Sequence, residues 1–204
     1  MASRYIGLLV DWGGVLTTNV FDSFRAFCEG EGLSPDEVGA RFRHDRAVRQ
    51  LLIDLETGEL EEIEFQVGFG AALGVQPEGL IDRLFGGVHA DEEMISAVGR
   101  AREAGIHTGL ISNSWGTRRY DRALLSELFD GVVLSGEERM RKPTPAIYEL
   151  GAERIGVPAS SCVFVDDLAF NLEPAAELGM ATVHHVDSAA SIAELERLFA
   201  VALR

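Results

Sequence analysis

The sequence predicts an α/β protein with a Rossmann-like parallel sheet core and an inserted α-helical cap. From residue 91 onward, apolar runs of four to six residues alternate with helical stretches, which is typical of parallel strands joined by crossover helices. Residues 18–98 show helical periodicity without a convincing strand. The apolar run at residues 5–10 ends in Asp11 and a glycine turn, and open α/β folds place their sites at that end of a strand.

The core is expected at residues 1–17 and 91–204. Its strands are short apolar runs bounded by polar residues or glycine, predicted at residues 5–10, 106–111, 131–134, 162–165 and 181–184. Its helices are predicted around residues 94–101 (ending at Gly105), around 120–128, over roughly 144–155, up to Gly179, and around 192–199. These elements alternate as right-handed βαβ units require.

The cap is expected at residues 18–90, where four or five short helices follow the first strand. The segment Ser34–Glu37 predicts a helix start, because Ser34 can cap the helix, Pro35 suits its first turn, and Glu37 can close a capping box. Apolar stripes at helical spacing predict the remaining cap helices, at residues 20–28, 48–55, 63–73 and 80–85.

The composition argues against several classes of protein. The formal net charge of −15 opposes binding to nucleic acid or to anionic membranes, and it makes a basic local site for an anionic substrate conspicuous. The chain has no apolar run long enough to span a membrane and no signal-peptide pattern. Cys28 and Cys162 are expected to be free, buried thiols of a cytoplasmic protein. Nothing in the sequence indicates an oligomeric state.

Polar residues follow three of the predicted strands: Asp11, then Ser112 and Asn113, then Asp166–Asp167, with Lys142 in a loop before the last. Parallel strands share one carboxyl edge, so we expect these residues to lie together. Each alone has an ordinary explanation as a helix cap or a turn, but their joint position at strand ends favours a site. Crowded carboxylates suit Mg²⁺, and Asp11 can attack phosphorus while its other oxygen binds the metal.

These segments resemble, in order and spacing, the four motifs of the haloacid dehalogenase (HAD) superfamily. Asp11–Leu16 resembles the first motif, Ile111–Asn113 the second, Lys142 with Pro143 the third, and Phe164–Asp167 the fourth. The resemblance covers nearly the whole chain, because residues 18–90 match the family's helical cap, which covers the site and selects the substrate.

The resemblance also implies roles for particular residues. Asp11 would be the nucleophile and a Mg²⁺ ligand, the Gly13 carbonyl and Asp167 would be further ligands, and Asp166 would bind the metal directly or through water. Ser112, Asn113 and Gly14 would bind the substrate phosphate, and Lys142 would balance its charge on the nucleophile.

Gly13 departs from the family's phosphatases, which usually carry a second aspartate at this position as general acid. Such a group contributes about 10²–10⁴-fold in rate. Three outcomes are open: the enzyme favours substrates with good leaving groups, a cap residue or water replaces the acid, or phosphatase activity is vestigial. The basic cap segment Arg41–Arg49, which contains His44, Asp45 and Arg46, offers candidate replacements, although its ordinary interpretation is a solvated helix face. Trp115 is expected to pack over a substrate or on the core.

We therefore predict a Mg²⁺-dependent phosphatase that hydrolyses a small phosphorylated metabolite, with sugar phosphates as one candidate class, through an aspartyl-phosphate at Asp11. One alternative is a metal-free hydrolase similar to the 2-haloacid dehalogenases, in which Arg41 or Arg43 holds a carboxylate; the pair Asp166–Asp167 opposes this. The other alternative is a non-catalytic HAD-like binding module.

Overall fold

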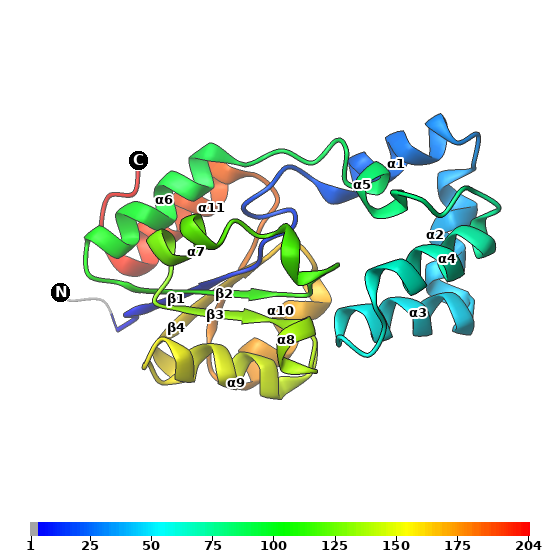
Figure 1. Ribbon diagram of the computed structural model, residues 1–204. Helices are drawn as coiled ribbons and strands as arrows, with labels where there is room; N and C mark the ends of the chain where they lie inside the picture. The colour runs from blue at the N-terminus through cyan, green and yellow to red at the C-terminus, as the bar shows by residue number, and fades with distance from the viewer. Residues whose placement is uncertain (1–3) are drawn as a thin grey trace.

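The computed structural model describes residues 4–204, so residues 1–3 of the predicted core lie outside the described part. Within residues 4–204, five parallel strands form one sheet in the order β3-β2-β1-β4-β5 (Figure 1). The strands are β1 (Gly7–Val10), β2 (His107–Ser112), β3 (Gly131–Leu134), β4 (Cys162–Asp166) and β5 (Ala181–His184). All five predicted strands are confirmed, and the fold is α/β and Rossmann-like.

Helices cover both faces of the sheet (Figure 1). One face packs against α6 (Glu92–Glu103), α7 (Arg122–Leu128) and α11 (Ser188–Phe199). The other face packs against α9 (Pro145–Arg154) and α10 (Ala169–Glu177). Three short elements that the sequence did not predict complete this part: α8 (Ser135–Glu138) and the 3₁₀ turns η1 (Thr117–Arg119) and η2 (Ala159–Ser161).

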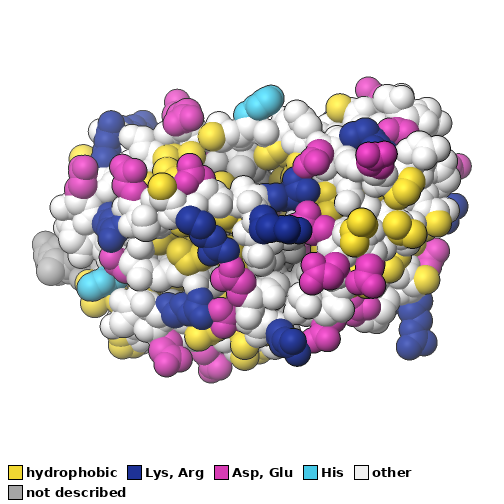
Figure 2. Space-filling model, in the orientation of Figure 1, with side chains coloured by type: hydrophobic (Ala, Val, Ile, Leu, Met, Phe, Trp, Pro, Cys, Tyr) yellow, Lys and Arg dark blue, Asp and Glu magenta, His cyan; other side chains and the backbone are white. Residues whose placement is uncertain are grey.

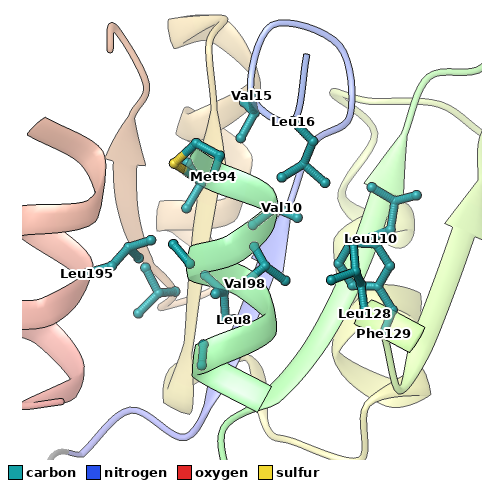
Figure 3. Packing of buried hydrophobic residues seen from close by; sticks show 14 of the residues in the cluster. Leu8, Val10, Val15, Leu16, Met94, Val98, Leu110, Leu128, Phe129 and Leu195 are labelled. Atoms are coloured by element: carbon teal, nitrogen blue, oxygen red, sulfur yellow. The ribbon is translucent and has the colours of Figure 1, made fainter. Parts of the chain in front are cut away.

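The central strand β1 is buried on both sides, as its uninterrupted apolar sequence predicts. Leu8 and Val10 point to one layer, where Figure 3 shows them beside Met94 and Val98 of α6, while Leu9 packs in the opposite layer. This packing fixes where β1 ends and therefore where the next residue, Asp11, emerges.

The helices between β1 and α6 gather at the carboxyl edge of the sheet, on the right in Figure 1. They are α1 (Val20–Gly30), α2 (Pro35–His44), α3 (Arg46–Glu56), α4 (Glu62–Leu73) and α5 (Leu80–Leu84). They enclose an apolar cluster of their own, which includes Phe27, Phe65 and Phe69. A backbone bridge joins Thr17 to Ala90, where the chain leaves and re-enters the sheet-bearing part. The helical insertion of the predicted fold is present.

Two local predictions need correction. Tyr120 lies outside helix α7, because Asp121 caps the helix by accepting hydrogen bonds from the backbone N–H groups of Ala123 and Leu124. Ser34 caps α2 as predicted, by accepting from Glu37 N at 3.4 Å, but the described hydrogen bonds include no return bond from the Glu37 carboxylate.

Two further features concern the chain as a whole. Cys28 and Cys162 are both buried and free, as predicted. Among the described helices, none combines the length and the apolar character that crossing a membrane requires.

Candidate active site

At the carboxyl ends of strands β1 and β4, two aspartates contact one lysine. Asp11 follows β1, Asp166 ends β4, and the Asp11 backbone N–H donates to Val165 O at 3.0 Å. Lys142 Nζ lies 2.8 Å from Asp11 Oδ1 and 2.6 Å from Asp166 Oδ2. The lysine is fully buried, so both ion pairs are screened only weakly by water.

The Lys142 ammonium is charged at neutral pH. Burial alone lowers its pKa, but the Asp11 and Asp166 carboxylates outweigh burial and raise the pKa above its ordinary value. Lys142 is also the only lysine among the 18 basic residues of the chain, the rest being arginine. A compact ammonium fits between two carboxylates in a closed site, where a planar guanidinium demands more room. This single lysine is a sequence signal that composition alone could have supplied.

Asn113 fixes the backbone of Lys142 rather than facing an open site. The Lys142 N–H donates to Asn113 Oδ1 at 2.8 Å, and Asn113 Nδ2 donates to Lys142 O at 3.1 Å. The structure therefore places the predicted phosphate ligand Asn113 next to the site with its amide engaged. In the structure, the Asn113 side chain holds the backbone of Lys142 in position.

Asp166 is saturated by hydrogen bonds. Its Oδ1 accepts from Leu168 N at 2.9 Å and from Asn171 Nδ2 at 3.0 Å, and its Oδ2 faces Lys142. Asn171 is itself held by Tyr148, whose hydroxyl donates to Asn171 O at 2.7 Å. Asp166 is thus oriented as a rigid partner of Lys142.

Three carboxylates come close enough to share a cation. Oxygen atoms of Asp11, Asp166 and Asp167 all lie within 4.8 Å of one another. Burial raises the pKa of Asp11 to about 7, with Asp166 and Asp167 adding to the shift and Lys142 opposing it. Burial and Asp166 raise the pKa of Asp167 to about 6. When all three are ionised, the three carboxylates against one ammonium leave a charge of −2, which one divalent cation would neutralise. Hard oxygen donors are the ligands that Mg²⁺ prefers, so these residues fit that ion.

The glycine turn after Asp11 serves close packing. Gly14 has φ of +74°, and a Cβ at this position would collide with Asp167 Oδ2, so Gly14 permits the approach of Asp167 to Asp11. Its N–H donates to Thr17 Oγ1 at 3.0 Å. Gly14, which was predicted to bind phosphate, therefore lies in the site, but its backbone N–H is already hydrogen-bonded to Thr17.

Ser112 reaches the site from the end of β2 and pairs with Tyr120, the two hydroxyl oxygens being 2.9 Å apart. Tyr120 packs edge-on against Trp12, with ring centroids 5.5 Å apart. Burial raises the pKa of the Tyr120 phenol, which therefore stays protonated at neutral pH. The apolar spacing predicted that Tyr120 belongs to a helix. Asp121 was the sequence feature that could have indicated a later helix start, because aspartate is a common N-cap residue.

The helical insertion is tied to the strand-end loops by buried and ionic contacts. Trp115, from the loop after β2, packs at 5.3 Å from Phe65 and 5.4 Å from Phe85, and its Nε1 donates to the buried Glu56 at 3.2 Å. Glu56 Oε2 lies 2.5 Å from Arg141 Nε, an ion pair without hydrogen-bond alignment. Glu56 was not among the predicted residues, because an acidic residue at the end of an amphipathic helix carries no distinctive signal.

Ionic contacts continue this junction at the surface. Arg119 pairs with both Asp82 of α5 and Glu62 of α4. Figure 2 shows basic and acidic side chains side by side in the middle of this face, between the sheet-bearing part and the helical insertion.

A pocket of about 100 Å³ lies between the insertion and the strand ends. Twelve residues line it: Trp12, Gly13, Thr17, Val20, Phe85, Val88, Ser112, Asn113, Trp115, Gly116, Arg119 and Tyr120. The basic segment Arg41–Arg49 contributes none of them, and Arg41, His44 and Arg46 line a separate shallow hollow on α2 and α3. The structure therefore does not bring the cap residues His44, Asp45, Arg46 and Arg49 to the pocket, as replacement of the missing acid would require.

Comparison with known proteins gives a family and several relatives. A family model described as haloacid dehalogenase-like hydrolase matches residues 7–179. The chain is 30% identical over 112 residues to bifunctional epoxide hydrolase 2 of Rattus norvegicus, covering 52% of this chain and 20% of that protein. It is 33% identical over 87 residues to fructose-1-phosphate phosphatase YqaB of Escherichia coli (strain K12), covering 43% of this chain and 42% of the relative. The chain therefore matches only about a fifth of the length of the rat enzyme.

The fold also matches solved structures. A mutant HAD family enzyme from Bacteroides thetaiotaomicron, in complex with magnesium and inorganic phosphate, superposes with a TM-score of 0.68 and 21% sequence identity. The superposition covers 88% of this chain and 93% of that one.

Proposed function

The chain belongs to the haloacid dehalogenase-like hydrolases, and from this membership we propose that it is a Mg²⁺-dependent phosphatase of small phosphate monoesters that works through an aspartyl-phosphate at Asp11. One observation carries the proposal: Asp11, Asp166 and Asp167 converge around the buried Lys142, so a nucleophile, a cation-binding set and an ammonium occupy one strand edge. The E. coli relative is named as a phosphatase, which supports the reaction class.

Hydrogen bonding assigns different tasks to the two Asp11 oxygens. Oδ1 accepts from Trp12 N at 2.7 Å and faces Lys142 Nζ at 2.8 Å, which fixes the carboxylate plane. Oδ2 has no hydrogen bond among the described residues, so we assign it as the attacking atom. An Oδ2–P bond forms while the bond from phosphorus to the leaving oxygen breaks, and water protonates the departing alkoxide. A second water then attacks phosphorus, which restores the Asp11 carboxylate and releases phosphate.

The metal would be held by Asp11, Asp167 and the Gly13 carbonyl, with Asp166 acting directly or through water. When bound, Mg²⁺ supplies positive charge that offsets the carboxylates and the substrate phosphate. Lys142 would balance the remaining negative charge beside the nucleophile, and the Ser112 hydroxyl, which pairs with Tyr120, would donate to a phosphate oxygen. The division into a core at residues 1–17 and 91–204 and a cap at 18–90 stays a prediction, supported by the bridge between Thr17 and Ala90.

Phosphate release tests this proposal. Acyl, anomeric and ordinary alkyl phosphates are incubated with the protein in Mg²⁺ or in EDTA. We expect turnover in Mg²⁺ and none in EDTA, with a bias toward good leaving groups because Gly13 supplies no acid. Turnover that is unchanged by EDTA, or absent from every class in Mg²⁺, would contradict the proposal.

Mg²⁺ affinity is expected to increase as the pH rises from about 5 to about 8. The free carboxyls of Asp11 and Asp167 have pKa values of about 7 and about 6, and protons compete with the cation for their oxygens. Both pKa values lie above the ordinary value of 3.8, so the contribution of these groups to the stability of the metal-free fold is fully present below pH 3.8 and is lost as the pH rises from there to the folded pKa values of about 6 and about 7. Thermal unfolding with and without Mg²⁺ measures both effects. A Mg²⁺-induced shift in Tm that is the same at pH 5 and pH 8 would exclude these ligands.

Gly13→Asp is expected to raise the turnover of alkyl phosphates by about 10-fold or more, because it adds the missing proton donor. Gly13 lies outside the left-handed region of backbone φ, and a Cβ there would meet only Val20 Cγ2, at 3.2 Å. Gly13→Asn is the matched control, with the same shape and no transferable proton. Equal rates for the two variants would show that the general acid is not what Gly13 lacks.

The dehalogenase alternative is less well supported by the structure. Arg41 and Arg43 do not line the pocket, and the lining guanidinium of Arg119 already pairs with Asp82 and Glu62. Release of halide from a panel of haloacids in the absence of Mg²⁺ would support the dehalogenase alternative. The binding-module alternative predicts tight complexes with phosphorylated ligands and no turnover at saturating Mg²⁺.

A further inference from the structure

The side chains that line the pocket are mostly apolar and aromatic. They come both from the strand-end loops and from the helical insertion: Trp12, Val20, Phe85, Val88, Trp115 and Tyr120. Two of these side chains are held in place by specific contacts. Trp115 packs edge-on against Phe24 and Phe85 and bonds to Glu56, while Tyr120 packs against Trp12 and pairs with Ser112. The pocket wall is therefore a defined surface.

The polar side chains of the same pocket already have partners. Thr17 Oγ1 accepts from Gly14 N and donates to Thr18 O, each at 3.0 Å. The Asn113 amide is engaged at both ends by the Lys142 backbone. The hydroxyls of Ser112 and Tyr120 pair with each other, and the one O–H that this pair leaves free is the one that the proposed function assigns to a phosphate oxygen. A sugar hydroxyl that entered this pocket would lose water without gaining a free side-chain partner from Thr17 or Asn113, which is unfavourable.

Arg119 is the charged side chain among the described residues of the lining, and it is neutralised by Asp82 and Glu62. The pocket therefore offers no unpaired charge to a second anionic or cationic group on the substrate. Its volume of about 100 Å³ also limits the guest. An apolar cavity of about 150 Å³ accommodates benzene, so the volume of this partly open pocket is of the order of one small ring.

Building on the proposed phosphatase activity, we infer that the substrate is a phosphate monoester whose organic part is small, apolar and free of hydroxyl groups. The apolar wall and the paired polar groups both disfavour a polyhydroxylated sugar. An aryl group fits best, because a phenolate leaves more readily than an alkoxide and the site lacks an acid at Gly13 to assist departure.

Matched pairs of esters test the inference apart from leaving-group strength. Phenyl phosphate is compared with 3,5-dihydroxyphenyl phosphate, and cyclohexyl phosphate with inositol monophosphate, all in Mg²⁺. We expect kcat/KM to favour the apolar member of each pair by about 10-fold or more, as a site without partners for hydroxyls should. Equal rates, or a preference for the hydroxylated members, would overturn the inference and leave the phosphatase proposal standing.

A binding measurement separates the two proposals when turnover is absent. Phenylphosphonate and hydroxymethylphosphonate, whose P–C bonds cannot be hydrolysed this way, are titrated calorimetrically in Mg²⁺. Tighter binding of phenylphosphonate without turnover of any ester would reject the phosphatase and support the apolar pocket. Equal affinities for the two phosphonates would reject the apolar pocket.

Isosteric variants test whether the apolar lining of the pocket causes the preference for apolar esters. The double variant Val20→Thr, Val88→Thr adds two hydroxyls to the pocket lining at unchanged shape. It should lower kcat/KM for phenyl phosphate about fivefold or more, and it should reduce the ratio of kcat/KM for phenyl phosphate to that for 3,5-dihydroxyphenyl phosphate. Val67→Thr, on the exposed face of α4 outside the pocket, is the control and should change neither value. An unchanged preference in the double variant would show that this wall does not select the substrate.

Discussion

Lys142→Met is expected to destabilise the metal-free protein by about 3–5 kcal/mol, because it leaves two buried carboxylates without their cation. The variant removes the ammonium that lies 2.8 Å from Asp11 and 2.6 Å from Asp166. The Asp11 carboxyl can respond by taking up a proton, so its pKa, already raised by burial, rises further and the native state binds more protons than the unfolded one. The loss of stability should therefore be larger at pH 8 than at pH 5. Urea unfolding at both pH values measures it.

Two further variants serve as controls for this experiment. Arg139→Met removes a positive charge three residues away, where the side chain is 75% exposed and pairs with Glu59, so it should cost less than about 1 kcal/mol. Lys142→Arg keeps the charge but enlarges the group in a fully buried position, and it should also lose stability. A Lys142→Met protein as stable as the parent at pH 8 would show that the lysine does not hold the carboxylates together.

Asp11→Asn is expected to lower kcat by at least about 10⁴-fold for every substrate, because an amide cannot form the phosphoryl-enzyme. The fold should survive. Burial and the neighbouring carboxylates raise the pKa of Asp11 to about 7, so ionised Asp11 is costly in the metal-free site and a neutral isostere should not reduce Tm at pH 8. Phosphate release and thermal unfolding, run on the same preparation, separate loss of chemistry from loss of structure. Retained turnover would remove Asp11 from its proposed role.

The strand-end part of the site was predictable from the sequence. Asp11, Ser112 and Asp166 each close an apolar run, and parallel strands necessarily present such residues on one edge. Lys142 was grouped with these residues from its position before the last of these strands, and the family resemblance then implied its role. The ammonium lies between two of the predicted carboxylates. The structure brings these residues together because the apolar runs mark the strands and the crossover helices make the strands parallel.

The pocket wall was not predictable in the same way. Val20 and Phe85 lie on helices, or at the end of helices, whose apolar faces were visible, but periodicity does not say which end of a helix meets the core. Tyr120 was hidden in a predicted helix that begins two residues later. The basic segment Arg41–Arg49 was conspicuous by charge, yet the structure gives it no place in the pocket.

Gly14 shows a different limit. The family resemblance implied a phosphate ligand, whereas in the structure its N–H is bonded to Thr17 and its missing Cβ makes room for Asp167. A glycine signals backbone freedom or close approach, and only the folded chain shows which neighbour uses it.

The most direct measurement of the central claim is the detection of the phosphoryl-enzyme. The protein is mixed with phenyl phosphate and Mg²⁺, quenched in acid within its first turnover, digested and analysed by mass spectrometry. The proposal predicts one added phosphoryl group on the peptide that contains Asp11, absent in EDTA and in Asp11→Asn. Phosphate release at the normal rate with Asp11 never modified, or modification at another residue, would contradict it.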